Sequence, residues 1–271
     1  MLPHATPAVV LTFAATDPSG GAGIQADLMT SSALNCHCLS VVTAVTVQDS
    51  IGVDGVEPVP ASLLTRQARK ILADIPVDAF KIGLIGSAEN VSAIVRVLAD
   101  YPDVPVVFDP VLASGRGDSM ATEAMIDAMR GQLLPRTTVL TPNSLEARRL
   151  AGQSPSDEQH SPLSQCANQL RALGSRYVLV TGTHEETPAV VNTLYGPSGV
   201  IRADTWERLP GSYHGSGCTL ASAVAAYLAR GLAIDEAVRK AQEYAWQTLS
   251  HGFRAGKGQF IPNRFFKQFT P

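Results

Sequence analysis

Short apolar runs alternate with amphipathic stretches along most of this chain of 271 residues. The runs at 8–15, 39–47 and 104–110 are apolar almost throughout, which is typical of strands buried on both faces. Helix-like stretches of roughly ten or more residues separate these runs. The alternation predicts βαβ units, and therefore an α/β fold with a mainly parallel sheet that helices cover on both faces.

The predicted elements continue to the end of the chain. We expect strands at 8–15, 39–47, 79–83, 104–110, 137–143 and 177–183, and helices at 23–34, 61–74, 88–99, 121–134, 162–173, 217–230 and 234–250. Segment 188–206 differs, because two strand-like runs flank the turn 196–199, which favours a β-hairpin in the C-terminal half. The polar stretch 152–162 does not end the α/β rhythm, so we interpret residues 1–271 as a single domain.

Charge and composition exclude several classes of function. The chain has 21 basic and 24 acidic residues, a formal net charge of −3, which argues against nucleic acid or an anionic membrane as the main partner. No apolar run approaches the roughly 20 residues of a membrane-spanning helix, and the N-terminal segment reads as a strand rather than a signal peptide. Four cysteines are too few for a disulfide scaffold at this length. We expect a cytoplasmic protein that acts on small molecules.

A glycine-rich turn follows the first predicted strand, where ligands of parallel sheets bind. The stretch 17–27 reads DPSGGAGIQAD, which is neither a dinucleotide-binding nor a Walker motif. Glycine here either closes an ordinary tight turn or lets a ligand approach bare backbone. Asp27, in the helix that follows, is either a surface charge or a carboxylate that faces a small polar ligand.

A second glycine turn, YHGSGC at 213–218, precedes a predicted helix. Its unpaired backbone N–H groups and the helix dipole together predict an anion hole of the kind used in phosphoryl transfer. Cys218 lies in the same field, which favours its thiolate. The competing interpretation is a capped turn followed by a small buried cysteine.

Oxygen-bearing side chains end two further strands. Asp109 follows one strand, and Asn143 and Glu146 follow the next. Mg²⁺ prefers carboxylates together with water and substrate phosphates, so these residues indicate a magnesium site at the strand ends. Asn143 also suits the N-cap of a helix.

Taken in order, these motifs resemble a known family. They are TDPSGGAGIQAD (16–27), VTAVTVQDS (42–50), KIG (81–83), DPV (109–111), TPN (141–143) with Glu146, and HGSGC (214–218). The set is similar to the hydroxymethylpyrimidine/phosphomethylpyrimidine kinases of thiamine biosynthesis, in the ribokinase-like superfamily, over residues 8–250. The resemblance implies a three-layer sandwich, a homodimer, and ATP- and Mg²⁺-dependent phosphorylation of 4-amino-5-hydroxymethyl-2-methylpyrimidine and then of its monophosphate.

The resemblance also implies roles for individual residues. The pyrimidine would contact Gln48, Asp27, Ala15, Ala22, Thr46, Leu84 and Val111. The transferred phosphoryl group would lie against Gly215, Ser216, Gly217 and Cys218, with Cys218 as the general base or as a group that orients the acceptor hydroxyl. The nucleotide would contact Asn143, Thr181 and Gly182, and Mg²⁺ would be held by Asp109 and Glu146.

Three alternatives remain open at this point. Ala15 stands where the family usually has glycine, and TGTH at 181–184 stands where it commonly has KGGH. These departures leave room for a pyridoxal/pyridoxine kinase or for a pyrimidine-binding module without catalysis, although the Gln48 amide can pair with a ring nitrogen and an exocyclic amine together. A cysteine hydrolase would need His214 as the base of Cys218.

Overall fold

The computed structural model describes residues 6–114, 116–152 and 161–267, so most of the predicted polar loop, residues 153–160, lies outside the described part. The large sheet contains β1 (Ala8–Ala14), β2 (Cys36–Val42), β5 (Ala79–Ile82), β6 (Val106–Phe108), β7 (Val139–Leu140), β8 (Tyr177–Val180), β9 (Ala189–Gly196) and β10 (Gly199–Glu207). A small ribbon contains β3 (Ala44–Gln48) and β4 (Val53–Pro58). The helices are α1 (Gly23–Ala33), α2 (Ala61–Leu72), α3 (Ala88–Leu98), α4 (Glu123–Ala128), α5 (Ser144–Leu150), α6 (Leu163–Ala172), α7 (Ser216–Ala229) and α8 (Ile234–Ser250).

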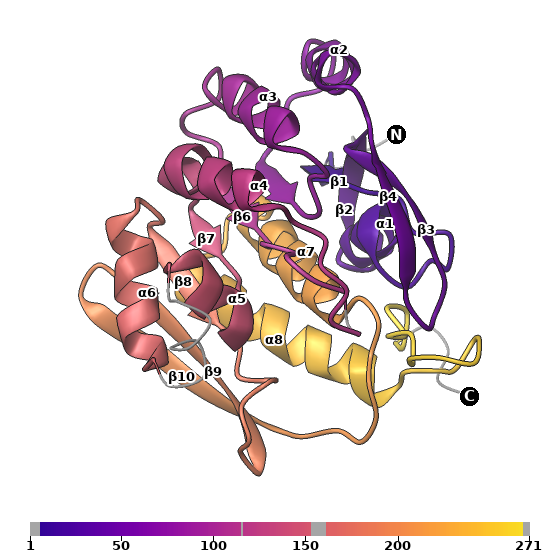
Figure 1. Cartoon of the computed structure of the whole chain (residues 1–271), viewed down its shortest axis with the longest axis vertical. Helices are drawn as coiled ribbons and strands as arrows, with labels where there is room; N and C mark the ends of the chain where they lie inside the picture. Colours follow the sequence, from indigo (N-terminus) through magenta and orange to yellow (C-terminus); the bar gives the residue numbers. More distant parts are fainter. Residues whose placement is uncertain (1–5, 115, 153–160, 268–271) are drawn as a thin grey trace.

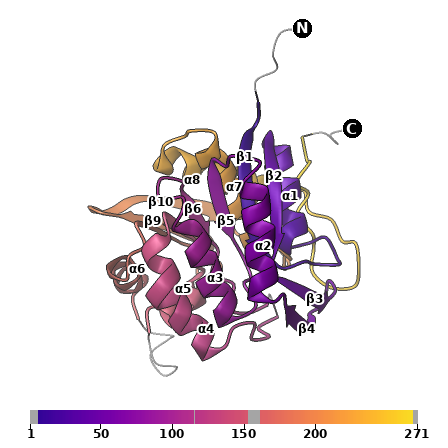
Figure 2. The ribbon, with the colours of Figure 1, turned by 90° about the horizontal axis from the view of Figure 1, so that it is seen from above.

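The predicted α/β sandwich is confirmed. The strand order is β10-β9-β8-β7-β6-β5-β1-β2, and the strands from β8 to β2 are parallel to one another. The predicted hairpin is β9–β10, which extends the sheet in antiparallel fashion from β8. Helices α2 to α6 cover one face of the sheet, and α1, α7 and α8 cover the other (Figures 1 and 2). Among the described residues, none of the helices is both long and apolar enough to cross a membrane.

The run at 39–47 is not one strand, as the sequence predicts, but parts of two. Thr43 separates β2 from β3, and its Oγ1 donates to the carbonyl of Leu84 over 2.5 Å. Beyond it the chain leaves the large sheet and pairs antiparallel with β4, a strand that the sequence analysis missed. Val45 and Val47 are exposed in this ribbon while Ala44 is buried, so its apolar residues lie on both of its faces. A pattern that is apolar on both faces is the reason it resembled a buried strand.

The predicted helix at 121–134 is also interrupted. It begins after Thr122, whose side chain accepts from the Met125 N–H, and remains α-helical only to Ala128. A wider turn over Met129–Leu133 and a tighter one over Leu134–Arg136 follow. The tighter turn contains Pro135, which has no N–H to continue an α-helical ladder.

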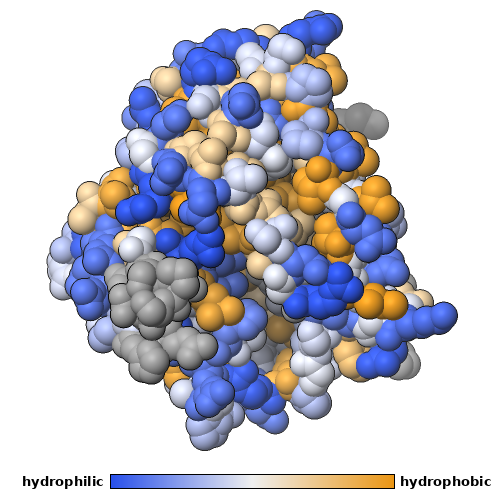
Figure 3. Space-filling view, viewed as in Figure 1, coloured by the Kyte–Doolittle hydropathy of each residue, from blue (hydrophilic) through white to orange (hydrophobic). Residues whose placement is uncertain are grey.

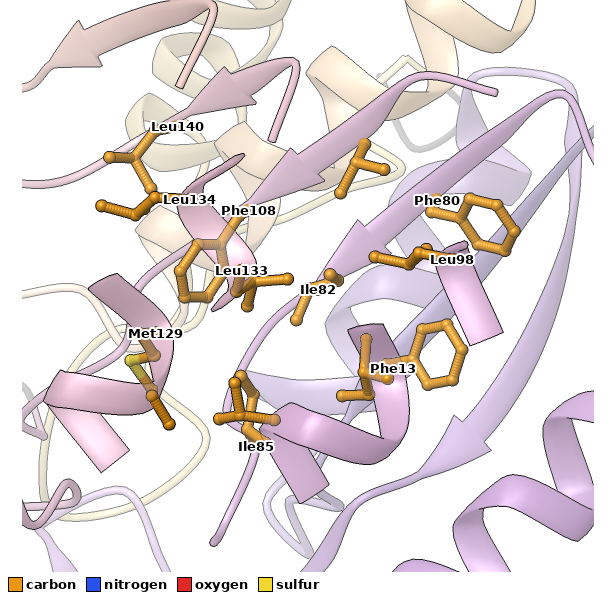
Figure 4. Packing of buried hydrophobic residues seen from close by; sticks show 14 of the residues in the cluster. Phe13, Phe80, Ile82, Ile85, Leu98, Phe108, Met129, Leu133, Leu134 and Leu140 are labelled. Carbon is orange, nitrogen blue, oxygen red and sulfur yellow. The ribbon is translucent and has the colours of Figure 1, made fainter. Parts of the chain in front are cut away.

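A rigid apolar core fixes the strand ends. Phe13, Phe80 and Phe108 come from neighbouring strands, are fully buried, and point into the layer of α2 to α6 (Figure 4). On the opposite face, α7 packs through small residues such as Ala221 and Ala225, so this helix lies close to the sheet. Because both faces are closely packed, the loops that leave the strands start from fixed positions.

Candidate active site

A cavity of about 710 Å³ lies at the carboxyl ends of the parallel strands. It is lined by the loops after β1, β5, β6, β7 and β8, by the β3–β4 ribbon and by the start of α7. In the orientation of Figure 1, the face of the molecule is hollowed near its middle, where apolar and hydrophilic residues meet (Figure 3). This volume and position are those of a small-molecule site in a parallel α/β sheet.

Asp17 organises the first glycine turn. Its buried carboxylate accepts hydrogen bonds from the Ser19 N–H (2.9 Å) and the Ala22 N–H (2.6 Å), and lies 2.8 Å from His214 Nε2. Burial opposes ionisation, but the partners His214, Ser19 and Ala22 outweigh it and lower the pKa of Asp17. Gly23 has a positive φ of 58°, and a Cβ there would collide with the carbonyl oxygen of Ala15. The turn is therefore held by a carboxylate, and it is joined to the second glycine turn through His214.

The predicted anion hole lies at the start of α7. Gly215 is the N-cap with a positive φ of 80°, and Ser216, Gly217 and Cys218 form the first turn of the helix. All four residues line the cavity. A Cβ at Gly215 would collide with the Gly21 carbonyl oxygen, so the two glycine turns are in direct contact. Free N–H groups at a helix N-terminus that faces a cavity can bind a phosphoryl group.

The expectation that Cys218 is a thiolate is wrong. Burial raises the pKa of the Cys218 thiol to about 12, and the opposing attraction of Lys81 is not sufficient to restore it. The carboxylates Asp109 and Asp27 raise the pKa of the thiol further. Cys218 is therefore a neutral thiol at neutral pH, although it starts a helix and lines the cavity as predicted.

Lys81 is a site residue that the sequence analysis missed. It is fully buried on β5, and its Nζ donates to the two carboxylate oxygens of Asp27 over 2.9 and 3.0 Å. Both Asp109 and Cys218 act electrostatically on this ammonium group, and Lys81 lines the cavity. Gly83 leaves room for the ammonium group, since a Cβ there would lie 2.6 Å from Nζ. The KIG motif contributed to the family resemblance. The sequence does not reveal which partner neutralises a lysine in a fully buried strand.

Contrary to the prediction, Asp27 does not face the cavity. It is 1% exposed and accepts from Thr12 Oγ1 and Ser222 Oγ, each over 2.6 Å, as well as from Lys81. Its carboxylate lies outside the cavity lining. The Asp27 carboxylate therefore fixes the position of the Lys81 ammonium group, because a buried carboxylate needs a paired cation and hydrogen-bond donors.

Asp109, Asn143 and Glu146 all line the cavity, as expected of strand-end residues. Asn143 Oδ1 accepts from the Glu146 N–H and the Glu146 carboxylate accepts from the Asn143 N–H, each over 2.9 Å, so the two residues form a capping box on α5. Glu146 also accepts from the Leu112 N–H, and burial together with Asp109 raises its pKa to about 8. Its oxygens are thus engaged by backbone.

Asp109 differs from Glu146 in having an oxygen to spare. Its Oδ2 is buried and has no hydrogen-bond partner among the described residues. Burial is the main cause that raises the pKa of Asp109 to about 6; Lys81 and a side-chain hydrogen bond with Cys218 oppose this rise, and Asp27 adds to it. No cluster of three or more acidic, histidine or cysteine side chains that could hold a metal occurs in the described part of the chain. A hard cation held by one carboxylate and by substrate phosphates fits the unpartnered oxygen of Asp109.

Most of the residues that were predicted to contact a pyrimidine lie together. Ala15, Leu84 and Val111 belong to one apolar cluster, which Met120 joins as a member that the sequence analysis missed. These residues line the cavity together with Ala22, Thr46 and Gln48. The Thr46 hydroxyl donates to the Thr16 carbonyl over 2.8 Å, which ties the β3–β4 ribbon to the loop after β1.

The predicted nucleotide residues divide into two groups. Thr181 lines the cavity beside Asn143, with which it forms an isolated parallel bridge. Gly182 does not line it; its N–H donates to Asn192 Oδ1 over 3.1 Å, and a Cβ there would collide with the Val191 carbonyl oxygen. This end of the cavity has features that the sequence analysis missed.

The residues that the sequence analysis missed at this end of the cavity are Trp206, Trp246 and Arg208. The rings of Trp206 and Trp246 stack with centroids 6.4 Å apart, and both residues line the cavity. Arg208 donates to the carbonyls of Thr183, Glu185 and Thr187 and so holds the loop that begins with TGTH. Arg208 and Trp246 each contact residues that lie about 20 to 40 positions away in the chain, and no local motif could reveal such contacts.

Comparisons with known proteins agree with this geometry. A family model described as phosphomethylpyrimidine kinase matches residues 17–263. A hydroxymethylpyrimidine/phosphomethylpyrimidine kinase of Streptomyces coelicolor is 42% identical over 260 residues, with 94% of each chain covered. A solved phosphomethylpyrimidine kinase of Clostridium difficile has a TM-score of 0.75 at 33% identity and covers 89% of this chain and 99% of its own. A pyridoxal kinase of Bacillus subtilis, solved with ADP, has a TM-score of 0.88 at 28% identity and covers 98% of this chain and 100% of its own. This chain belongs to the phosphomethylpyrimidine kinase family.

Proposed function

We propose that this protein transfers the γ-phosphoryl group of ATP to the hydroxymethyl oxygen of 4-amino-5-hydroxymethyl-2-methylpyrimidine, and then phosphorylates the monophosphate to the diphosphate. The observation that carries the proposal is the placement of the anion hole, Gly215 to Cys218, in one cavity with Gln48 and the apolar cluster around Leu84. The names of the relatives at high coverage support the same reaction.

The acceptor would lie over the loop after β1. Its ring fits the apolar surface of Ala15, Leu84 and Val111, and the Gln48 amide at the end of β3 offers a donor and an acceptor to the aminopyrimidine edge. The hydroxymethyl group then points toward Cys218. A flat heteroaromatic ring with one polar edge is therefore the class of acceptor that this pocket would bind.

The phosphoryl group would bind at the start of α7. As the oxygen of the alcohol forms its bond to the γ-phosphorus and the bridging bond to ADP breaks, negative charge is held by the N–H groups of residues 216–218. Lys81 adds a buried positive charge close to Cys218 and Asp109. The alcohol proton passes to an oxygen of the transferred phosphoryl group, and Cys218, as a neutral thiol, orients the hydroxyl.

Magnesium is the cation that this chemistry needs, and Asp109 is the residue that fits it. When bound, Mg²⁺ neutralises charge on the nucleotide phosphates and orients them. The Asp109 carboxylate supplies a ligand oxygen with no protein partner among the described residues. Glu146 acts mainly by capping α5, which fixes the loop next to Asp109.

Replacing Asp109 with asparagine is expected to stabilise the protein at neutral pH while removing Mg²⁺-dependent activity. Folding raises the pKa of Asp109 from 3.8 to about 6, so the native state binds the proton more tightly than the unfolded chain and stability falls as pH rises through this window. The Asp109→Asn variant removes that loss, a gain of about 2–3 kcal/mol at pH above 7 that vanishes below pH ~4. Urea unfolding at both pH values measures it.

The exposed residue Asp103 provides the control for this experiment, because Asp103→Asn should leave the free energy of unfolding unchanged at both pH values. A gain for Asp109→Asn that is equal at acid and neutral pH would show that the buried charge is not its source.

Replacing Cys218 with alanine is expected to lower kcat by only about tenfold, because a thiol that is neutral at pH 7 orients the acceptor more effectively than it removes a proton. A general base commonly contributes 10² to 10⁴ in rate, so the size of the loss separates the two roles. Steady-state kinetics with the pyrimidine alcohol measure it, with Cys218→Ser as the variant that keeps a hydroxyl. A loss of a thousandfold in both variants would assign the base role to the thiol.

A pyridoxal or pyridoxine kinase is the second candidate, because such enzymes share this fold and their substrate is also a hydroxymethyl heteroaromatic alcohol. Gln48 favours the aminopyrimidine, and parallel assays of both alcohols with ATP decide. A binding module without catalysis is disfavoured by the intact anion hole, and calorimetry with an ATP analogue tests it.

A homodimer and a cytoplasmic location complete the proposal. Val45 and Val47 on β3 and Ile51 in the β3–β4 turn are exposed, and they offer an apolar surface that a second copy would cover. Sedimentation velocity of the wild type and of a Val47→Lys variant tests the dimer.

A further inference from the structure

The segment that follows α8 folds back across the site. The Phe260 N–H donates to the Ser212 carbonyl over 2.9 Å, and the His214 N–H donates to the Phe260 carbonyl over 2.8 Å. Farther along the cavity mouth, the Gln259 N–H donates to the Ser50 carbonyl in the β3–β4 turn over 2.8 Å. In Figure 1 this segment is the yellow trace beside β3 and β4. Residues 251–267 therefore contact the edges of the site, and we call them the C-terminal strap.

Arg264 carries the strap into the interior. It is 3% exposed, and its own carbonyl accepts from the Tyr244 hydroxyl on α8 over 2.8 Å. Its Nη2 donates to the Gly21 carbonyl over 2.5 Å, in the first glycine turn. Its Nε donates to Thr219 Oγ1 over 3.1 Å, on the first turns of α7. One planar guanidinium thus joins the two turns that form the site.

The bridge continues to the anion hole itself. The Thr219 hydroxyl that accepts from Arg264 donates in turn to the Gly215 carbonyl over 2.8 Å. Gly21, the other partner of Arg264, is the residue whose carbonyl oxygen packs against Gly215. Burying a guanidinium is costly unless its donors are used, and here two of them are directed at the junction of the two glycine turns.

We propose that Arg264 is a positioning residue that sets the spacing between the first glycine turn and the anion hole, and that the docked C-terminal strap supports the catalytic site through this one side chain. Ala22 of the acceptor pocket and Gly215 of the phosphoryl site line the same cavity, so a shift between these turns would change the distance between the reacting groups. A misplacement of about 1 Å costs about a hundredfold in rate while each ligand still binds. The inference rests on the proposed phosphoryl transfer. The family model ends at residue 263, just before Arg264.

The test compares four single variants at Arg264 and Thr219, the double variant Arg264→Met/Thr219→Val, and a control variant at Arg254. Arg264→Met removes both bonds, and Arg264→Lys keeps a charge without the two-pronged geometry. Thr219→Val removes the hydroxyl that relays to Gly215, and Thr219→Ser restores it. Arg254 is the matched control, because this arginine of the same strap lies over the Phe260 ring, 4.8 Å from its centroid, and does not line the cavity.

The expected kinetic result is a loss of kcat with little change in KM. Arg264→Met and Thr219→Val should each lower kcat by about ten- to a hundredfold, with KM for the alcohol and for ATP within about threefold of the wild type. The double variant should be no worse than Arg264→Met, since both changes break one chain of bonds. Thr219→Ser should restore kcat, Arg264→Lys should fall between, and Arg254→Met should match the wild type.

A second readout does not depend on the acceptor. Hydrogen exchange of the whole protein should accelerate in peptides that cover 17–23 and 213–219 in Arg264→Met, and not in Arg254→Met. Faster exchange confined to the strap, with full kcat, would overturn the inference and assign Arg264 to anchoring the chain end. A wild type that phosphorylates neither alcohol would contradict the proposed function instead, and the exchange result would still decide whether Arg264 couples the two turns.

Discussion

Replacing Gly215 with alanine is expected to lower kcat by about two to three orders of magnitude, the cost of losing a donor from an oxyanion-type site. Gly215 has a φ of 80° and is the N-cap of α7. A Cβ would collide with the carbonyl oxygen of Gly21, so the start of the helix must move away from the first glycine turn. The N–H groups of residues 216–218 would move with it. Steady-state kinetics on protein shown to be folded by circular dichroism measure the loss.

Gly231 provides a matched control at the other end of α7. Its φ is 82°, and a Cβ there meets no atom within 4 Å. Gly231→Ala should therefore impose the same left-handed strain, about 1 kcal/mol, with unchanged kcat. If both alanine variants lose activity equally, strain alone is responsible and the contact between the glycine turns does not matter.

Replacing Lys81 with methionine is expected to destabilise the protein by about 3–5 kcal/mol, because it leaves the carboxylate of Asp27 buried without its cation. The ion pair is 0% and 1% exposed at its two side chains, so solvent cannot compensate. Asp27 would retain only the hydroxyls of Thr12 and Ser222. Urea unfolding measures the change in the free energy of unfolding.

A double variant separates charge from packing. Lys81→Met combined with Asp27→Asn should be more stable than the sum of the two single changes predicts, since Asp27→Asn removes the buried charge that Lys81→Met leaves unpaired. The pair of Arg69 and Asp100 joins N and O over the same 2.9 Å but is 57% and 50% exposed. Arg69→Met should change stability by less than about 1 kcal/mol. Equal effects at the two pairs would refute the assignment of Lys81 as a buried charge.

The fold was largely predictable because periodicity and turn chemistry act locally. The apolar run of β1, the glycine turn at its end and the start of α1 are adjacent in the chain, so one stretch of sequence contains the whole βα unit. The β3–β4 ribbon was missed because the chain leaves the large sheet at Thr43. The side chain of Thr43 bonds there to the carbonyl of Leu84, which lies 41 residues away in the chain.

The site was predictable where residues follow strands, and not where their neighbours decide their state. Asp109, Gln48 and Gly215 were predicted at strand ends or turns, and all of them line the cavity. Asp27, predicted to contact the pyrimidine from the helix after the first glycine turn, is instead buried beside Lys81 and lies outside the cavity lining. The pKa of Cys218 depends on the same burial, which raises it despite the positive charge of Lys81.

Tertiary pairing explains the residues that no motif revealed. Arg264 lies 243 residues from Gly21 and 45 from Thr219 in the chain, so the sequence alone does not indicate that these residues are in contact. The same holds for the stacked rings of Trp206 and Trp246, which come from β10 and α8. Short motifs predict where chemistry occurs, while the groups that hold the motifs in register come from distant segments.

The most direct measurement of the central claim is a product analysis with ATP and Mg²⁺. The protein is incubated in parallel with 4-amino-5-hydroxymethyl-2-methylpyrimidine and with pyridoxine, and the products are separated by anion exchange and identified by mass. We predict that the pyrimidine monophosphate forms first and the diphosphate follows, with pyridoxine a poor substrate. Phosphorylation of pyridoxine alone, or of neither alcohol by protein that binds both ATP and the pyrimidine, would contradict the proposed pyrimidine kinase activity.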